Sequence, residues 1–273
     1  MIFRGHIKSM ENIDFIVEQS TTKKYSLSGS TLKIIAIIAM IIDHIAVVLL
    51  GRIVPIEIFG LSFRRISSLS EFEKIIIIFY YTMRIIGRIS FPIFAYLLIE
   101  GFMHTKNLKK YAIRLGIFAL ISEIPYDLAM SNRIIYLRKQ NVFFLLFISL
   151  LVIAGIKKIG EKKKGIISIF LKLVCLFFGM VISDLISTDY GYIGVLTIVV
   201  IYFLRDKGKD ISIVSGCFVL MISVKLEIVS IFSLIPIKLY NGNRGLDIKY
   251  IFYMAYPAHL IILYFIWKIV VFL

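Results

Sequence analysis

The sequence predicts an all-α membrane protein with about eight transmembrane helices and both termini in the cytoplasm. Of its 273 residues, 59% are hydrophobic, and the mean hydropathy is +0.92. Apolar runs of helix length recur to the C-terminus, and basic residues gather in the short links between them. A soluble protein needs a mostly polar exterior, so this composition excludes a soluble domain.

The predicted spans follow from length, because a helix needs about 20 mostly apolar residues to cross a bilayer. They lie near residues 31–50, 75–100, 109–129, 141–157, 166–186, 191–205, 211–230 and 255–272. The second is long enough to be bent, and the sixth is short. Residues 1–30 are too polar for a signal peptide and predict a mobile cytoplasmic lead-in before one transmembrane domain, residues 31–273.

The net charge of +15 is explained by the links. Lys106, Lys109 and Lys110 follow the second span, KKIGEKKKG (157–165) the fourth and RDKGKD (205–210) the sixth. Basic links stay in the cytoplasm, which orients the spans. Short basic links between apolar runs predict contact with membrane lipid and anionic ligands and argue against nucleic acid.

Several ionisable residues fall inside or beside the predicted spans, where each costs a few kcal/mol and needs a partner or a purpose. They are Asp43 and His44 in the first span, Arg84 and Arg88 in the second, Glu123 in the third, Asp184 in the fifth, and Asp189 and Tyr190 in the turn that follows. The alternating orientation brings them into one layer in the middle and outer half of the bilayer. The alternative is a set of buried ion pairs that only fix helix register.

Prolines and one loop add to this layer. Pro92 and Pro125 each remove a helix hydrogen bond beside charged residues, as expected around a polar cavity. The loop 231–254, with Asn241 and Arg244, is predicted on the outer face. Pro257 fits the first turn of the last helix and would place His259 there, where unpaired N–H groups favour an anion.

Six stretches, in this order, resemble the TraX family of bacterial membrane proteins. They are LKIIAIIAMIIDHIAVVL (32–49), RIIGRISFPIFAYLLIEGFMHTKNLKKYAIRL (84–115), FALISEIPY (118–126), DYGYIGVLTIVVIYF (189–203), LYNGNRG (239–245) and FYMAYPAHLIILYF (252–265). The resemblance implies a multi-pass protein of the bacterial cytoplasmic membrane. It also implies an acetyl or acyl transferase that uses acetyl-CoA and an amine or another nucleophile as acceptor.

The resulting hypothesis assigns roles to these residues. His44 is the base or transient acyl carrier, Asp43 orients it, and His259 is the rival base. Arg84 and Arg88 stabilise the oxyanion. The acceptor meets Glu123, Asp184, Asp189, Tyr190, Asn241 and Arg244, and acetyl-CoA meets Lys106, Lys109, Lys110 and Arg114.

Two other functions fit the same charged layer. One is a transporter or flippase, and the other is a non-catalytic assembly factor for a surface structure. A metal or cysteine enzyme is not predicted, because Cys175 and Cys217 lie in apolar segments without metal-ligand spacing.

Overall fold

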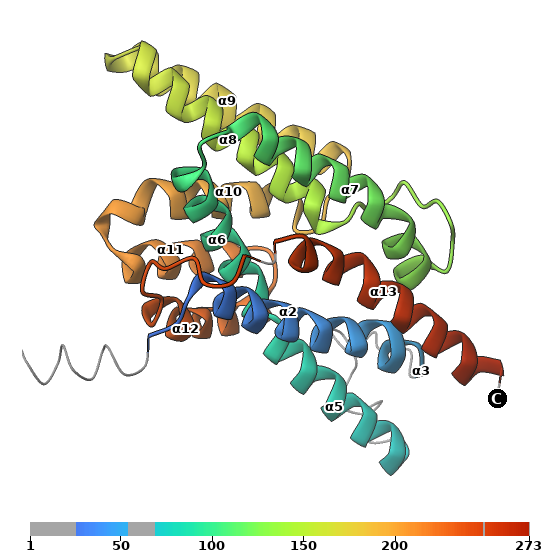
Figure 1. The fold of residues 1–273 in the computed structure, drawn as a ribbon. Helices are drawn as coiled ribbons and strands as arrows, with labels where there is room; N and C mark the ends of the chain where they lie inside the picture. The colour runs from blue at the N-terminus through green and yellow to red at the C-terminus, as the bar shows by residue number, and fades with distance from the viewer. Residues whose placement is uncertain (1–25, 54–68, 248, 273) are drawn as a thin grey trace, which may run out of the picture.

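The regular structure is helical throughout the residues that the computed structural model describes, 26–53, 69–247 and 249–272 (Figure 1). Five of the described helices are long and apolar enough to cross a bilayer. They are Gly29–Ile53, Glu71–His104, Val142–Lys162, Gly165–Leu185 and Tyr250–Val271. The prediction of an all-α helical membrane protein is therefore confirmed.

The first helix, α2 (Gly29–Ile45), begins where the side chain of Ser28 accepts a hydrogen bond from the backbone of Thr31. Five residues of π-helix, η1 (Ala46–Leu50), and the short α3 (Gly51–Ile53) extend it. The widened turn follows directly after Asp43 and His44, and π-helical turns often occur at functional sites.

A loop from the C-terminal half covers the start of α2. The backbone N–H groups of Gly29 and Ser30 donate to the carbonyls of Asn243 and Arg244, and Leu27 pairs with Tyr240. These bonds satisfy donors that a helix start leaves free. The folded part therefore begins before the predicted boundary at residue 31, and residues 1–25 lie outside the described part.

The second predicted span is bent, as its length suggested. It consists of α5 (Glu71–Gly87) and α6 (Ser90–His104), which meet at an angle around Arg88 (Figure 1). The break lies at Gly87, a poor helix former, and not at Pro92. Pro92 lies in the first turn of α6, where no helical partner for its nitrogen is lost.

Three long helices follow, α7 (Leu108–Ser131), α8 (Val142–Lys162) and α9 (Gly165–Leu185). Pro125 does not end α7, which continues for six residues beyond it. The helices α8 and α9 are antiparallel, since Cys175 lies beside Gly155 and Lys172 beside Gly160. Most of α9 faces outward, as expected for a lipid-facing helix.

The predicted span 211–230 is wrong, because the chain turns back inside it. After the 14-residue α10 (Gly191–Leu204) and the short η2 (Arg205–Lys207), α11 (Lys209–Met221) has only 13 residues. The chain then returns through the 3₁₀ helix η3 (Lys225–Ser233) and α12 (Leu234–Lys238). We call the segment from Lys209 to Lys238 the re-entrant hairpin.

Polar contacts close this hairpin at its base. The Lys238 ammonium pairs with Asp210 at 2.8 Å, and the Lys209 ammonium donates to the carbonyl of Tyr240 at 2.6 Å. The hairpin therefore enters and leaves at one end of the bundle. Lys225 and Glu227, which follow the turn, explain why the apolar run does not continue as one helix.

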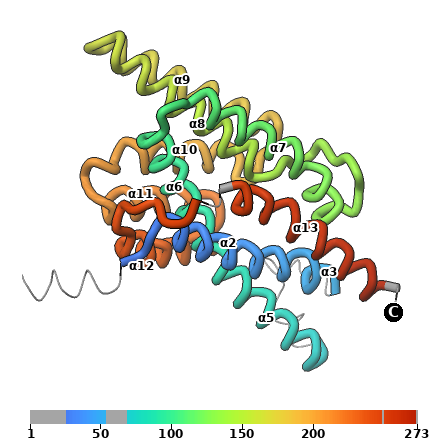
Figure 2. The backbone as a smooth tube through the Cα atoms, in the orientation of Figure 1, coloured from blue at the N-terminus to red at the C-terminus, as the bar shows by residue number. Residues whose placement is uncertain are grey.

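The last helix, α13 (Lys249–Phe272), runs parallel to α2. Three contacts in ascending order show this: Lys33 lies over Phe252, His44 meets His259, and Arg52 lies over Trp267. The end of α13 therefore lies at the opposite end of the bundle from the start of α2 (Figure 2). The prediction that both termini share one side is wrong for the described chain, because the re-entrant hairpin removes one crossing.

The two ends of the bundle differ in charge. One end holds the start of α2, the link 105–107, the α8–α9 link, the α10–α11 link and the loop 239–247, and we call it the basic end. It includes the lysine-rich run from Lys157 to Lys164. By the rule for basic loops, we expect the basic end to face the cytoplasm.

This topology can be tested with single cysteines introduced into a protein whose Cys175 and Cys217 are replaced by serine. We expect cysteines at Lys164 and Asn243 to react with an impermeant maleimide from one side of the membrane. A cysteine at Arg133 should react only from the other side. Labelling of Asn243→Cys and Arg133→Cys from the same side would contradict the re-entrant hairpin.

Candidate functional site

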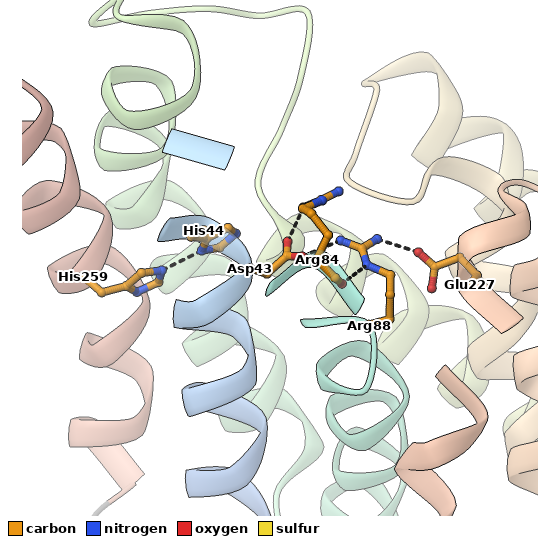
Figure 3. Close-up of polar contacts among 6 residues, drawn as sticks. All are labelled: Asp43, His44, Arg84, Arg88, Glu227 and His259. Atoms are coloured by element: carbon orange, nitrogen blue, oxygen red, sulfur yellow. Dashed lines mark hydrogen bonds and ion pairs between the residues drawn. The ribbon is translucent and has the colours of Figure 1, made fainter. Parts of the chain in front are cut away.

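Two adjacent residues of α2 point to opposite sides of the helix and organise two groups of contacts (Figure 3). Asp43 faces the bend between α5 and α6, whereas His44 faces α13. Each is only 9% exposed, so neither side chain can rely on water to balance its polarity. The partners of these two residues therefore define the candidate site.

Asp43 is held by two arginines. Its carboxylate accepts from Arg84 at 2.5 Å and from Arg88 at 2.8 Å. A Cβ atom at Gly87 would overlap the Asp43 side chain, so only glycine lets this helix approach so closely. The spacing of Arg84, Gly87 and Arg88 thus presents both guanidinium groups to one carboxylate.

A second carboxylate completes the cluster. Glu227, at the inner tip of the re-entrant hairpin, accepts from Arg88 at 2.5 Å and is 1% exposed. We call Asp43, Arg84, Arg88 and Glu227 the charge cluster. Its two carboxylates and two guanidinium groups sum to zero formal charge, which makes their burial in a membrane tolerable.

Arg84 and Arg88 differ in how many of their N–H donors bond to described residues. Arg88 is bound on three sides, since its Nε also donates to the carbonyl of Arg84 at 3.3 Å. The side chain of Arg84 is 22% exposed and, among the described residues, makes one ion pair, to Asp43. A guanidinium has five N–H donors, so Arg84 retains more of them for a substrate.

On the other side of α2, His44 and His259 form a hydrogen-bonded pair. His44 Nδ1 lies 2.6 Å from His259 Nε2, and the two ring planes are nearly parallel, with an interplanar angle of 6° and centroids 4.9 Å apart. His259 Nδ1 lies 2.7 Å from the backbone carbonyl of Ala255. Both histidines are buried.

These partners determine where the protons are in the neutral pair. A carbonyl oxygen can only accept, so His259 carries its proton on Nδ1 and its Nε2 is an acceptor. His44 Nδ1 must then be the donor in the bond between the rings. The two rings therefore have one nitrogen lone pair that accepts no hydrogen bond from a described residue, and it lies on His44 Nε2. This is the arrangement of an oriented base.

This geometry revises two predicted roles. Asp43 does not orient His44, because its carboxylate bonds to the arginines on the other side of α2; His259 holds the ring instead. His259 also lies ten residues into α13 and not in its first turn. No free backbone N–H groups of a helix start are available beside it.

Aromatic rings surround the histidine pair and the bend. Tyr256 meets both imidazoles edge-on, with centroids 6.0 Å from His44 and 5.6 Å from His259. Tyr190 stacks on Phe91, one turn after the bend, at 4.2 Å. Tyr190 has a φ of 64°, which is strained for a bulky residue, and such strain is typical of functional sites.

Asp189 lies next to Tyr190 in the turn between α9 and α10. Burial raises the pKa of its carboxyl, and the positive charges of Arg88 and Lys139 oppose that rise. These interactions link Asp189 electrostatically to the charge cluster. Asp189 and Tyr190 therefore lie close to the layer that the sequence predicted.

Glu123 belongs to a separate polar group nearer the end opposite the basic end. Its Oε2 accepts from the Asn141 side chain at 2.5 Å, and its Oε1 is buried without a hydrogen-bond partner in the described part of the chain. One turn on, Asp127 accepts from the backbone of Tyr136. The two arginines pair with Asp43 and Glu227 and not with Glu123.

Three other predicted site residues lie elsewhere. Asp184 is exposed near the start of α10 and makes no ion pair with a described residue. Asn241 donates to Ser26, and Arg244 pairs with Asp247, both at the basic end. The loop 231–254 was predicted on the outer face, but it caps α2, so these residues do not line the charge cluster.

The residues predicted to bind acetyl-CoA lie at or near the basic end. Lys106, Lys109 and Lys110 are exposed in the link before α7 and at its start. Arg114 is half-buried one turn further and packs over the ring of Tyr111. The predicted role of these four residues stays a prediction.

Glu227 is a member of the charge cluster that was not predicted from the sequence. The signal was present, since Glu227 interrupts the apolar run 211–235 and pairs with Arg88 from 139 residues away. Treating 211–230 as one crossing helix concealed it, because the residue then appeared near a helix end. Its partner could be known only once the hairpin was seen to fold back.

Two comparisons with known proteins give matches, one to a protein family and one to a single relative. A match to the family described as "TraX protein" covers residues 28–267. The chain belongs to the TraX family. A relative from Dichelobacter nodosus, named "Probable fimbrial assembly protein FimC, serogroup H1", is 27% identical over 267 residues, which span 89% of this chain and 96% of the relative. No solved structure matches the chain.

The charge cluster should be required for stability. We expect Asp43→Asn to lower the free energy of unfolding by about 3–5 kcal/mol, because it leaves two buried arginines with one carboxylate. The measurement is denaturant unfolding of the purified protein in detergent. Asp184→Asn is the matched control, with an expected change within about 0.5 kcal/mol. Equal effects of the two substitutions would contradict a buried, interdependent cluster.

Proposed function

We propose that this TraX-family protein is a membrane acyltransferase, which moves the acetyl group of acetyl-CoA to an amine or hydroxyl acceptor. The observation that carries the proposal is the free lone pair on His44 Nε2, held in place by the bonds from His44 to His259 and from His259 to Ala255. A passive assembly factor has no need for a histidine oriented in this way. Acyl transfer needs such a base.

In the proposed reaction, the acceptor nitrogen or oxygen attacks the carbonyl carbon of the thioester. His44 Nε2 takes the acceptor's proton as the new bond forms. The C–S bond then breaks, and the sulfur of coenzyme A leaves with the proton that His44 returns. The products are the acetylated acceptor and free coenzyme A, and His44 ends unchanged.

Arg84 is our candidate for the oxyanion of the tetrahedral intermediate. Arg84 bonds to Asp43, which is the neighbour of His44 on α2, and it retains N–H donors. Arg88 and Glu227 then have a different role, since their mutual bonds keep Asp43 and Arg84 in position. Preorganised donors of this kind stabilise developing charge most where water is excluded.

The two substrates are proposed to approach from opposite ends. Acetyl-CoA carries phosphates, so we expect it at the basic end, which we place on the cytoplasmic face of a bacterial cytoplasmic membrane. The acceptor would arrive from the other end. Asp189 and Glu123 lie within electrostatic reach of Tyr256, whose ring meets both imidazoles, and their carboxyl groups are our candidates to meet an amine.

The Dichelobacter nodosus relative favours a second, compatible function. Its name is that of a probable fimbrial assembly protein. We propose on this basis that the acceptor is a subunit of a surface structure, so that acetylation would be one step in its assembly. If no acetyl transfer occurs, a transporter and a non-catalytic assembly factor are the remaining candidates.

The proposal is tested by substitutions that separate the two histidines. His44→Gln should lower acetyl transfer from labelled acetyl-CoA by about 10²–10⁴-fold, because the base is lost. His259→Leu should also lower it, since His44 then loses the acceptor that fixes its tautomer. His259→Gln should restore part of the activity, because an amide can accept from His44 and donate to the Ala255 carbonyl.

The labelled acceptor is sought in an extract of surface components, and each variant is checked for its helical content and unfolding midpoint. Full activity of folded His44→Gln would remove His44 from the chemistry. A folded His259→Leu that is as active as the wild type, with His44→Gln inactive, would remove the orienting role of His259.

A further inference from the structure

A pocket at the basic end lies apart from the histidine pair and the charge cluster. It has a volume of about 390 Å³ and lies between α6, α8, α9 and α10, near the ends of these helices at the basic end. In Figure 1 the paired ends of α8 and α9 project beyond α6 and α10 on this side. Its wall carries three cationic residues, Lys157, Lys172 and Arg205, and two acidic ones, Glu161 and Asp206, of which Asp206 is paired with Arg205.

Lys172 is the most unusual of these residues. It lies seven residues into α9, inside the run IISIFLKLVCLFF (166–178), and an ionisable residue inside a membrane helix needs a partner. It forms no ion pair with any carboxylate of the described residues. Its ammonium is therefore available to an anion that enters the pocket.

The surrounding backbone is shaped to hold the Lys172 ammonium in the pocket. A Cβ atom at Gly160 would lie 3.1 Å from Lys172 Nζ and 3.3 Å from its Cε. Glycine at this position thus lets the long side chain of Lys172 reach back along α8 to the end of the helix. Such reaching of a lysine toward the membrane surface keeps its charge near polar groups.

The other two cationic residues of the pocket, Lys157 and Arg205, also lie at the basic end. Lys157 rests over the ring of Phe102, with its Nζ 5.5 Å from the centroid, and has no carboxylate partner among the described residues. Arg205 donates to Asp206 through its Nε and has further N–H donors on its guanidinium group. The walls also contain Tyr202 and Phe203, whose rings supply apolar surface beside the cations.

We propose that this pocket binds a phosphate-bearing anion, held by Lys157, Lys172 and Arg205. Basic pockets between membrane helices on the cytoplasmic side suit the headgroups of anionic lipids. The same chemistry fits the phosphates of coenzyme A. The coenzyme source rests on the proposed acetyl transfer, whereas the lipid source does not.

The test uses purified protein in neutral detergent and native mass spectrometry with four ligands. These are phosphatidylglycerol, phosphatidylcholine, coenzyme A and 3′-dephospho-coenzyme A. We expect Lys172→Gln to weaken binding of one phosphate-bearing ligand by about tenfold or more, because a charge-assisted bond is lost. Lys158→Gln is the matched control, since it removes a neighbouring charge of the same helix that does not line the pocket.

Gly160→Leu is a second variant that keeps every charge but takes the space of the Lys172 ammonium. It should weaken the same ligand as Lys172→Gln does, and it serves if Lys172→Gln does not fold. Selective loss of phosphatidylglycerol identifies a lipid site. Selective loss of coenzyme A, with dephospho-coenzyme A bound more weakly by the wild type, identifies a coenzyme site.

Equal binding by Lys172→Gln, Gly160→Leu and Lys158→Gln would overturn the proposal. Acetyl transfer is measured on the same preparations. If binding fails while transfer persists, only the pocket is refuted. If the wild type binds phosphatidylglycerol but never transfers acetyl, only the proposed function is refuted.

Discussion

The ion pairs around Asp43 connect three parts of the chain that lie far apart in the sequence. One carboxylate on α2 holds two arginines of the bend between α5 and α6, and the second arginine reaches Glu227 on the re-entrant hairpin. Each member is expensive to bury alone, and breaking such a pair costs about 3–5 kcal/mol. The four residues are therefore stable in the membrane only together.

This constraint explains features that look unrelated in the sequence. Gly87 is required because a side chain there would overlap Asp43. The bend lies at the same place, and Arg88 at the bend bonds to both carboxylates. The hairpin turns back in mid-membrane because Glu227 finds its partner there, and the polar residues after Met221 make a full crossing unfavourable.

The histidine pair depends on the same framework. Because Asp43 is occupied by arginines on one side of α2, His44 is left to face α13 on the other (Figure 3). There His259 gives it a fixed hydrogen-bond acceptor and Tyr256 bounds the rings. Adjacent residues thus serve separate purposes: one anchors the bundle, and the other carries the proposed chemistry.

By itself, the sequence determined the class of the protein and most of the residues of the layer. Hydrophobic length predicted membrane helices, and the cost of buried charge singled out Asp43, His44, Arg84 and Arg88, because both depend on local composition. Tertiary structure decided which of these groups meet. The pairing of His44 with His259, the role of Glu227 and the opposite ends of α2 and α13 depend on a segment that turns back within the bilayer. Hydropathy measures how apolar a segment is and not the direction it takes, so that turn could not be read from the sequence.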